Sequence, residues 1–229
     1  MAINATTRVV ALLGHPVAHS LSPRMQNAAF AARGLDWAYV AFDVRPERLA
    51  EAVRGLAAAG VAGANVTAPH KLAAAALCDE RDADSVNTLV FDNGRVLGSS
   101  TDAAALEGLS PQRPAIVGAG GAARAFAAAL PGARTFSRRG VWPPDVGEAD
   151  LVVHATPVRD RALFELREGQ TLVDLPYPGS ATADAARAAG ATVLDGLEVL
   201  VRQGAASFER WTGVPAPLDV MRNAVRSAP

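Results

Sequence analysis

Cysteine is almost absent from the 229-residue chain, which contains only Cys78. A single thiol forms no internal disulfide and provides no cluster of thiolates for a zinc site. The opening residues also lack the basic and apolar segments that make up a secretory signal. Both observations argue against export, and we expect a cytoplasmic protein.

Long apolar segments and an excess of one charge are missing as well. Half of the residues are hydrophobic, yet no apolar run approaches the roughly 18 residues that span a bilayer. The 22 basic and 23 acidic residues leave a net charge of −1. No stretch concentrates Lys or Arg as a protein that binds nucleic-acid phosphates does. The sequence therefore predicts no membrane span and no nucleic-acid partner.

Lysine is the scarcest charged residue, because only Lys71 among the 22 basic positions is a lysine. An ammonium group can give up its proton, whereas a guanidinium group stays charged. A chain that otherwise uses arginine therefore has a chemical reason to keep one amine. The alternative is an accident of composition, and composition alone leaves both explanations open.

Short apolar runs alternate with longer stretches of helical period, which is the pattern of β–α units. The expected fold class is α/β, and the chain is long enough for two domains. The short, polar and proline-containing segment 110–114 precedes a new strand and marks a boundary. We expect a first domain at 1–109, a second at 110–212, and a C-terminal helix at 213–229 that packs back on the first domain.

The apolar periodicity also predicts the elements of each domain. In the first domain we expect a hairpin around Asp92-Asn93-Gly94, since these residues tolerate positive φ, and Ser22 as a helix N-cap. The other expected strands are 9–13, 39–44, 63–67, 115–117, 134–136, 151–155, 171–174 and 192–194. The expected helices are 23–33, 46–59, one starting near 69, 101–109, 122–130, 181–189, 197–211 and 217–225.

A glycine-rich turn follows the strand at 115–117. Residues 118–123 read Gly-Ala-Gly-Gly-Ala-Ala and lie between a short apolar strand and a helix, as a dinucleotide-binding turn requires. Gly118 permits the tight turn, and Gly120 lets the backbone approach a pyrophosphate. The helix N-terminus adds the positive end of a dipole. The alternative is a strand–helix turn that binds no ligand.

The end of the next strand bears on the choice between NAD and NADP. An acidic residue there accepts the ribose 2′-hydroxyl of NAD, but this chain has Ser137-Arg138-Arg139. Two guanidinium groups and a hydroxyl suit a 2′-phosphate. The segment favours NADP, and the alternative is a pair of solvated loop arginines.

Polar residues gather where strands of the first half end. Ser20 and Ser22 lie in a strand–helix loop beside free backbone amides, where a small carboxylate could dock. Thr67 and Lys71 follow another strand, so they face the crevice at the carboxyl edge of the sheet. Asn87 adds an amide, and Asp102 adds a carboxylate, although an aspartate before a helix is often only a terminal charge or cap.

Together these segments resemble the shikimate dehydrogenase family almost from end to end. The resemblance rests on GHPVAHSLSP at 14–23, NVTAPHK at 65–71, VNTL at 86–89, TD at 101–102, the glycine turn and QGAASFERWTG at 203–213. It implies an N-terminal α/β domain that binds shikimate or 3-dehydroshikimate and a Rossmann-like domain that binds NADP. The implied activity is an NADP-dependent oxidoreductase of aromatic amino-acid biosynthesis, without metal, as a monomer or homodimer.

The resemblance also implies a role for individual residues. Lys71 and Asp102 would form the catalytic pair, and an accidental lysine would fall on that one of the 22 basic positions only rarely. The implied substrate-binding residues are Ser20 and Ser22 on the carboxylate, Thr67, Asn87 and Gln203 on the ring hydroxyls, and Tyr177 near the carboxylate. The implied cofactor-binding residues are Gly118, Gly120, Gly121, Ala122, Ser137, Arg138, Arg139, Thr156 and Gly196.

The sequence departs from the family pattern mainly around the cofactor. His154 stands where an Asn is usual, Arg159 replaces a Gly, Val199 replaces a Met, and Ser100 replaces an Asn. His154 either touches the cofactor or is a packed, hydrogen-bonded histidine that ends a strand. These departures leave two alternatives to a shikimate dehydrogenase: a catalytically weak ligand-binding paralogue, or an enzyme for quinate or an amino analogue.

Overall fold

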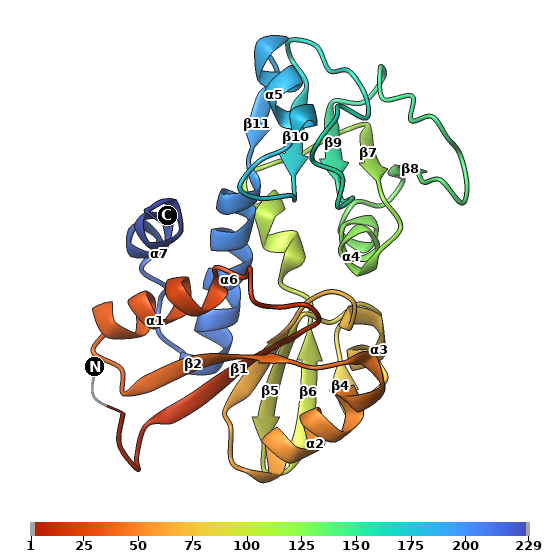
Figure 1. Cartoon of the computed structure of the whole chain (residues 1–229). Coiled ribbons are helices and arrows are strands. Elements are labelled where there is room, and N and C mark those ends of the chain that lie inside the picture. The colour runs from red at the N-terminus through yellow and green to blue at the C-terminus, as the bar shows by residue number, and fades with distance from the viewer. Residues whose placement is uncertain (1–2, 228–229) are drawn as a thin grey trace. The chain divides into compact units, whose positions relative to one another are not determined.

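The computed structural model describes residues 3–227, which form two compact units. The first unit contains the described residues up to Thr101 and from Val201 onward, and the second contains Asp102–Leu200. Both units are built from helices and strands, as the α/β prediction requires (Figure 1).

The first unit contains a six-stranded mixed sheet in the order β2-β1-β3-β5-β6-β4. Strands β1, β2 and β3 are parallel to one another. Strand β5 runs in the opposite direction, since it pairs antiparallel with both β3 and β6. The β5–β6 turn has positive φ at Asn93 and Gly94, as predicted. The elements of the unit are β1 (Arg8–Gly14), α1 (Ser22–Ala32), β2 (Trp37–Asp43), a 3₁₀ turn η1 (Pro46–Arg48), α2 (Leu49–Ala58), β3 (Gly63–Val66), α3 (Lys71–Ala75), β4 (Glu80–Arg81), β5 (Thr88–Asp92), β6 (Arg95–Ser99) and α7 (Leu218–Arg226).

Helices cover both faces of this sheet. Leu49 and Val53 of α2 pack with Leu13 of β1 in one buried cluster, which also contains residues of α3. On the other face Phe30 of α1 stacks on Phe208, with ring centroids 5.3 Å apart. Because side chains alternate along a strand, each strand supplies both layers.

The second unit contains a five-stranded parallel sheet in the order β11-β10-β9-β7-β8. Its elements are a 3₁₀ helix η2 (Asp102–Leu106), β7 (Pro114–Val117), α4 (Gly121–Ala129), β8 (Arg134–Phe136), β9 (Leu151–His154), β10 (Thr171–Asp174), α5 (Ala181–Ala188) and β11 (Thr192–Leu194). Helix α6 (Gly196–Thr212) begins in this unit and continues into the first. No helix or strand lies between β8 and β9.

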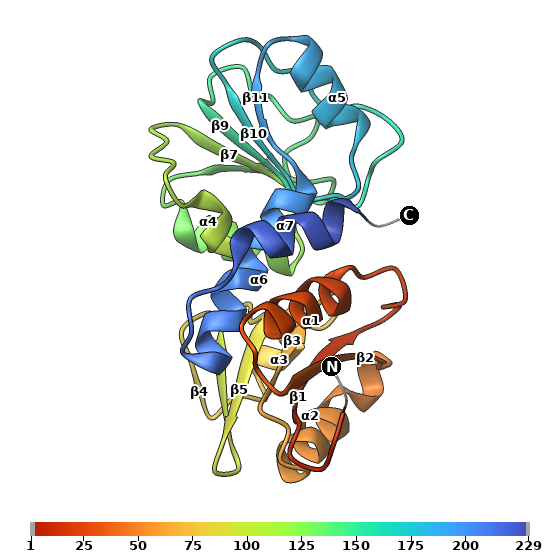
Figure 2. The same cartoon turned by 90° about the vertical axis from the view of Figure 1, so that its left-hand side faces the viewer.

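This second sheet is buried on both sides, with α4 and α5 on opposite faces (Figure 2). Phe126 of α4 packs with Ile116 and Val153, whereas Ala183 of α5 packs in the cluster of Val152. The strands therefore read as continuous apolar runs, which is typical of parallel sheets. The arrangement places the glycine turn after β7 at the carboxyl edge of the sheet.

The two units divide earlier in the chain than the expected domains. Leu106 of η2 packs with Phe126 of α4 in the second unit. Helix α6 belongs to both units, since Val199 lies in the core of the second and Phe208 stacks in the first. The expected assignment of substrate binding to one domain and cofactor binding to the other stays a prediction. Residues 1, 2, 228 and 229 of the expected domains lie outside the described residues.

Two local expectations are wrong. Ser22 is the first residue of α1 and does not cap it, because Leu21 occupies the N-cap position and the Ser20 hydroxyl accepts from the Ser22 N–H at 3.2 Å. The helix expected at 101–109 is only the short turn η2. Gly108 follows with φ of +80°, which is incompatible with a continuing helix. In the first unit the C-terminal helix α7 packs on α1, as expected.

Trp211 offers a test of the first unit's packing. Its indole Nε1 donates to the Leu89 carbonyl at 3.0 Å in a buried position, and the ring lies where a Cβ on Gly63 would stand. Trp211→Phe removes this buried hydrogen bond and leaves part of the indole volume empty, so it should lower the free energy of unfolding by about 2 kcal/mol. Urea denaturation followed by circular dichroism measures the change.

The control is Trp142→Phe, because Trp142 is 38% exposed in the second unit. That change should cost less than about 0.5 kcal/mol. Equal losses in the two variants would contradict the importance of the buried hydrogen bond.

Candidate functional site

Three chain segments meet at Asn87 in the first unit. The Asn87 Nδ2 group donates to Thr101 Oγ1 at 3.0 Å and to Gln203 Oε1 at 3.3 Å. Its Oδ1 accepts from the Thr101 N–H at 2.7 Å. Asn87 is only 2% exposed. The structure thus brings together two residues, Asn87 and Gln203, that are far apart in the sequence and that the resemblance assigns to the same ligand.

A buried polar network lies behind Asn87. The Thr88 and Ser207 hydroxyls share a hydrogen bond of 2.8 Å, and Thr101 lies 3.1 Å from Ser207. The Asn65 amide donates to Ser207 at 3.0 Å and to the Asn87 carbonyl at 3.0 Å. A buried donor or acceptor is costly when it is unpaired, so these groups hold one another in fixed orientations. The orientation of Asn87 follows from this network.

The proposed catalytic residues begin two helical turns. Lys71 is the first residue of α3, is half-buried, and its carbonyl accepts from the Val86 N–H at 3.0 Å. Asp102 is the first residue of η2 and is 6% exposed. Thr101, which is bonded to Asn87, directly precedes Asp102, so the network also determines where η2 starts.

The remaining substrate-site candidates lie at three further positions. Thr67 directly follows β3, and the absence of a Cβ on Gly14 makes room for it, since such an atom would lie 2.5 Å from the Thr67 methyl group. Ser20 and Ser22 lie at the start of α1, where among the described residues no side chain caps the helix. The backbone N–H groups at the start of this helix are suited to a carboxylate. Tyr177 follows β10 in the second unit and is half-buried.

The glycine turn has the geometry that a dinucleotide needs. Gly118 has φ of +144°, and any Cβ there would collide with the Ala155 carbonyl. A Cβ on Gly120 would meet nothing within 4 Å, so open space lies over the backbone at that point. Gly120 is the N-cap of α4, which no described side chain caps. An open approach and a helix dipole fit a pyrophosphate at Gly120, Gly121 and Ala122.

The arginine segment lies beside this turn because β7 and β8 are paired neighbours, with Val117 opposite Phe136. A hydrogen bond of 3.1 Å from the Ser137 N–H to the Val141 carbonyl closes the loop that contains both arginines. Arg138 and Arg139 are exposed. The Arg138 guanidinium lies 5.8 Å from the centroid of the Trp142 ring. Two exposed cations next to an open pyrophosphate site suit the additional phosphate of NADP.

The segment after β9 contains Thr156, a candidate cofactor ligand. Its Oγ1 lies 2.7 Å from Nε2 of the buried His154 and accepts from the Val158 N–H at 3.2 Å. His154 is therefore a packed, hydrogen-bonded histidine, one of the two alternatives raised by the sequence. Gly196 lies at the start of α6, where a Cβ would collide with the Pro176 carbonyl.

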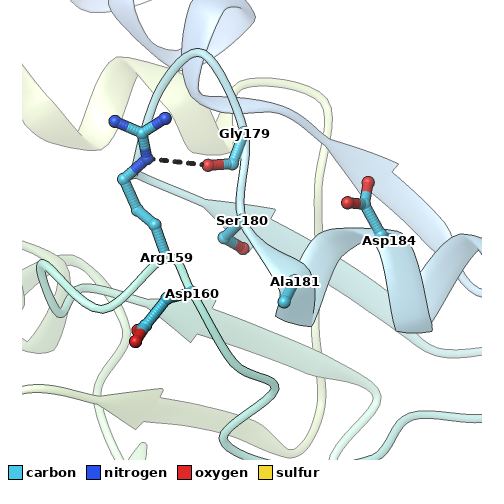
Figure 3. Close-up of a pocket in the computed structure, with 6 residues that line it drawn as sticks. All are labelled: Arg159, Asp160, Gly179, Ser180, Ala181 and Asp184. Carbon is cyan, nitrogen blue, oxygen red and sulfur yellow. Dashed lines mark hydrogen bonds between the residues drawn. The ribbon is translucent and has the colours of Figure 1, made fainter.

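An open hollow of about 450 Å³ lies near this segment. It is lined by Arg159, Asp160, Gly179, Ser180, Ala181 and Asp184 (Figure 3). The Arg159 side chain lies beside the loop of Gly179 and donates from Nε to the Gly179 carbonyl at 3.0 Å. Two carboxylates and one guanidinium line the hollow, so it has no positive net charge to suit an anion. None of the residues expected to bind substrate or cofactor lines it.

Several residues of the site could not be identified from the sequence. Asn65, Thr101 and Ser207 form the support of Asn87, and Asp174 and Ser180 are bonded near His154. Their only signal is a polar residue inside an otherwise apolar strand or helix face. That pattern predicts a buried hydrogen bond but does not name its partner.

Other kinds of site find no support among residues 3–227. No group of three His, Cys, Asp or Glu side chains there could hold a metal ion. Burial raises the pKa of the Cys78 thiol, against a smaller opposing effect of Arg81, so this cysteine is not activated as a thiolate. No helix in the described chain is long and apolar enough to cross a membrane.

Comparison with protein families gives two matches on this chain. Residues 12–89 match the family described as the shikimate dehydrogenase substrate-binding domain. Residues 196–226 match the shikimate 5′-dehydrogenase C-terminal domain. The first match covers Ser20, Ser22, Thr67, Lys71 and Asn87, and the second covers Gln203.

Similar proteins cover nearly the whole length. A shikimate dehydrogenase (NADP⁺) from Methanopyrus kandleri is 41% identical, over 98% of this chain and 97% of its own. The crystal structure of shikimate 5-dehydrogenase from Thermus thermophilus, in complex with NADP(H) and shikimate, has a TM-score of 0.85 at 34% identity, over 96% of this chain and 98% of its own. The structure of shikimate dehydrogenase from Aquifex aeolicus has a TM-score of 0.88 at 31% identity, over 99% of this chain and all (100%) of its own.

Proposed function

The chain belongs to the shikimate dehydrogenase family, and we infer from this membership that it is an oxidoreductase that interconverts 3-dehydroshikimate and shikimate with NADP. Its relatives act with NADP(+) by name, and one of them is solved with both NADP(H) and shikimate. The reaction belongs to the biosynthesis of aromatic amino acids.

The observation that best supports this function is the convergence on Asn87. One side chain joins Gln203 of α6 and the Thr101 that precedes Asp102, by hydrogen bonds of 3.3 and 3.0 Å. Shikimate is a small polyhydroxy carboxylate, and such a ligand needs oriented amides and hydroxyls rather than an apolar pocket. A preformed polar cluster on the first unit meets that need.

We propose that the first unit binds the substrate at two ends. Ser20 and Ser22, with the uncapped start of α1, bind the carboxylate. Thr67, Asn87 and Gln203 bind the ring hydroxyls by hydrogen bonds. Tyr177 contacts the carboxylate from its position after β10. A set of donors at both ends fixes the orientation of the ring, which is how positioning contributes to catalysis.

Lys71 moves the proton in this proposal. In the reduction its ammonium group donates a proton to the oxygen at the reacting carbon, and in the oxidation its amine accepts that proton. Before transfer its positive charge stabilises the negative charge that develops on this oxygen. Asp102 holds the lysine and binds a substrate hydroxyl.

The second unit holds the cofactor. Gly118, Gly120, Gly121 and Ala122 cradle the pyrophosphate, and Ser137, Arg138 and Arg139 bind the 2′-phosphate, with Thr156 and Gly196 as further contacts. When bound, NADPH supplies the hydride of the reduction. The exposed position of both arginines leaves their guanidinium groups available for bidentate hydrogen bonds.

The wider setting follows from the same family membership. We propose a cytoplasmic enzyme with a small-molecule substrate, no nucleic-acid partner and no metal, which acts as a monomer or homodimer. The second candidate is a ligand-binding paralogue of low activity, and its only support is the departure from the family pattern at His154 and Arg159 near Thr156.

Absorbance at 340 nm separates these functions. Purified protein with shikimate and NADP should form NADPH, and NAD should be the poorer oxidant. Absence of turnover together with binding of shikimate would instead support the paralogue. Faster turnover of quinate than of shikimate would identify the other alternative, an enzyme for quinate.

Replacement of Lys71 tests the proton transfer. Lys71→Ala should lower kcat by about 10²- to 10⁴-fold and weaken shikimate binding far less, because the contacts to the carboxylate and hydroxyls remain. Steady-state kinetics and calorimetry measure the two quantities. Lys71→Arg is the matched control, since it keeps the charge but does not release a proton at neutral pH. A nearly normal kcat in either variant would contradict the role.

Replacement of Ser20 and Ser22 tests the carboxylate site. The double change to Ala should raise KM for shikimate more than it lowers kcat, because a remote carboxylate is bound equally in the ground and transition states. KM for NADP should stay constant. A rise in KM for NADP alone would show that these serines affect cofactor binding and not the substrate carboxylate.

Replacement of both Arg138 and Arg139 by Ala tests the choice of cofactor. Each charge-assisted hydrogen bond is worth roughly 1.5–3 kcal/mol, so NADP affinity should fall by at least about tenfold. NAD affinity should hardly change, because NAD has no phosphate there. Salt at about 0.5 M should weaken NADP binding to the unmodified protein through screening. Calorimetric titration with both cofactors measures the effect, and equal losses would indicate damage to the loop.

A further inference from the structure

His154 and Asp174 form a buried ionisable pair that the proposed chemistry does not use. They end the neighbouring strands β9 and β10 and lie opposite each other in the ladder. His154 Nδ1 lies 2.6 Å from Asp174 Oδ1, and both side chains are 0% exposed. Burial of a carboxylate is costly unless its oxygens accept hydrogen bonds. The pair therefore needs a structural or functional reason.

Hydrogen bonds extend this pair in both directions. On one side the Ser180 hydroxyl lies 2.9 Å from Asp174 Oδ2 and caps α5 by accepting from the Ala183 N–H at 3.1 Å. On the other side His154 Nε2 lies 2.7 Å from Thr156 Oγ1. One continuous chain of hydrogen bonds thus connects the start of α5 to Thr156.

The donors and acceptors of these groups limit where the protons lie. An ionised carboxylate only accepts, so the His154 Nδ1–H donates to Asp174. We take the imidazole as neutral, with a lone pair at Nε2 to which the Thr156 hydroxyl donates. The Val158 N–H occupies one lone pair of Thr156 Oγ1 at 3.2 Å. Thr156, which is partly exposed, keeps one lone pair as an acceptor.

The strand order indicates which part of a dinucleotide meets this acceptor. In the order β11-β10-β9-β7-β8, the arginine loop follows β8 and Thr156 follows β9, on opposite sides of the glycine turn after β7. In such sheets a dinucleotide crosses the carboxyl edge at the glycine turn, with one nucleoside on each side. With the 2′-phosphate bound after β8, the nicotinamide nucleoside lies on the other side of the glycine turn, at β9.

We propose that Asp174 and His154 are positioning residues that hold the Thr156 hydroxyl as an acceptor for an N–H or O–H group of the nicotinamide nucleoside. This inference rests on the proposed function, because it needs a bound nicotinamide cofactor. The nucleoside is common to NADP and NAD. Loss of the pair should therefore weaken both cofactors equally, unlike loss of the arginines.

Asp174→Asn is the principal variant, because it keeps the side-chain volume and places an amide donor beside Nδ1. The proton of the imidazole then moves to Nε2, and Thr156 has to accept where it donated before. Thr156→Val removes the hydroxyl at nearly constant volume, whereas Thr156→Ser keeps it. Phe164→Leu is the matched structural control, since the Phe164 ring packs edge-on against the His154 ring at 5.9 Å without joining the hydrogen bonds.

The measurement is Kd for NADP and for NAD by calorimetry, in a double-mutant cycle of Asp174→Asn and Thr156→Val. Each single change should weaken both cofactors by about 2- to 10-fold. The double variant should bind as Thr156→Val does, within about twofold, because Asp174 acts only through the threonine. Thr156→Ser and Phe164→Leu should keep the affinity, and Phe164→Leu should only lower Tm.

Nitrogen-15 NMR of the imidazole checks the protonation directly. The resonance of His154 is assigned by its loss in His154→Asn. It should show the proton on Nδ1 in the unmodified protein and on Nε2 in Asp174→Asn. This spectrum and the comparison of Thr156→Val with Thr156→Ser also test the inference if Asp174→Asn does not fold.

Four results would overturn the inference: additive losses in the cycle, unchanged affinity in Thr156→Val, a loss confined to NADP, or a His154 protonated on both nitrogens. Failure of the unmodified protein to bind either cofactor or to oxidise shikimate would instead refute the proposed function. The two failures are therefore distinguishable.

Discussion

A polar side chain inside a protein must find hydrogen-bond partners there, and both units depend on this constraint at the sheet edge where their parallel strands have their carboxyl ends. In the first unit Asn65 of β3, Thr88 of β5 and Asn87, which precedes β5, are bonded to one another, and the first two also to Ser207. In the second unit Asp174 is bonded to His154 and Ser180. In each cluster the buried polar groups bond to one another instead of to water, so the cluster orients the side chains at its edge. The proposed substrate and cofactor contacts lie at these edges.

Glycine supports the same edges by a different mechanism. At Gly118 a positive φ and a carbonyl in the position of a Cβ both exclude any other residue. At Gly14 the missing Cβ makes room for Thr67. The first glycine shapes the turn that we propose for the pyrophosphate, and the second lets a hydroxyl lie beside β1. Neither makes a side-chain contact, which is why glycine matters here through backbone conformation and space.

The departures from the family pattern have a consistent physical explanation in the second unit. His154 is longer than the usual Asn, and it reaches Asp174 on one side and Thr156 on the other. The segment between β8 and β9 is short, and in this chain it brings Trp142 next to Arg138. Both changes keep polar groups near the proposed cofactor residues Thr156 and Arg138, although through different partners. The altered sequence is therefore compatible with a cofactor site.

Much of the architecture could be predicted from the sequence because it depends on local patterns. Apolar periodicity indicated the strands, Asn93-Gly94 indicated the hairpin, and the glycine turn indicated a phosphate-binding strand–helix junction. The short motifs also identified the family, since residues such as Lys71 recur at characteristic spacings. Ser22 was misassigned as a cap because two serines compete at the start of α1, and local pattern does not decide between them.

Only the tertiary structure decided the partners of the polar residues. Nothing in the sequence joins Asn87 to Gln203 or Asp174 to His154, since hydrogen bonds across a sheet depend on strand order and register. The fold also decided how α6 is divided between the two units. A helix with an apolar stripe packs wherever a complementary apolar face is available, and its own sequence does not identify that face. The sequence by itself therefore determined which chemical groups the chain carries, and the fold determined which of them meet.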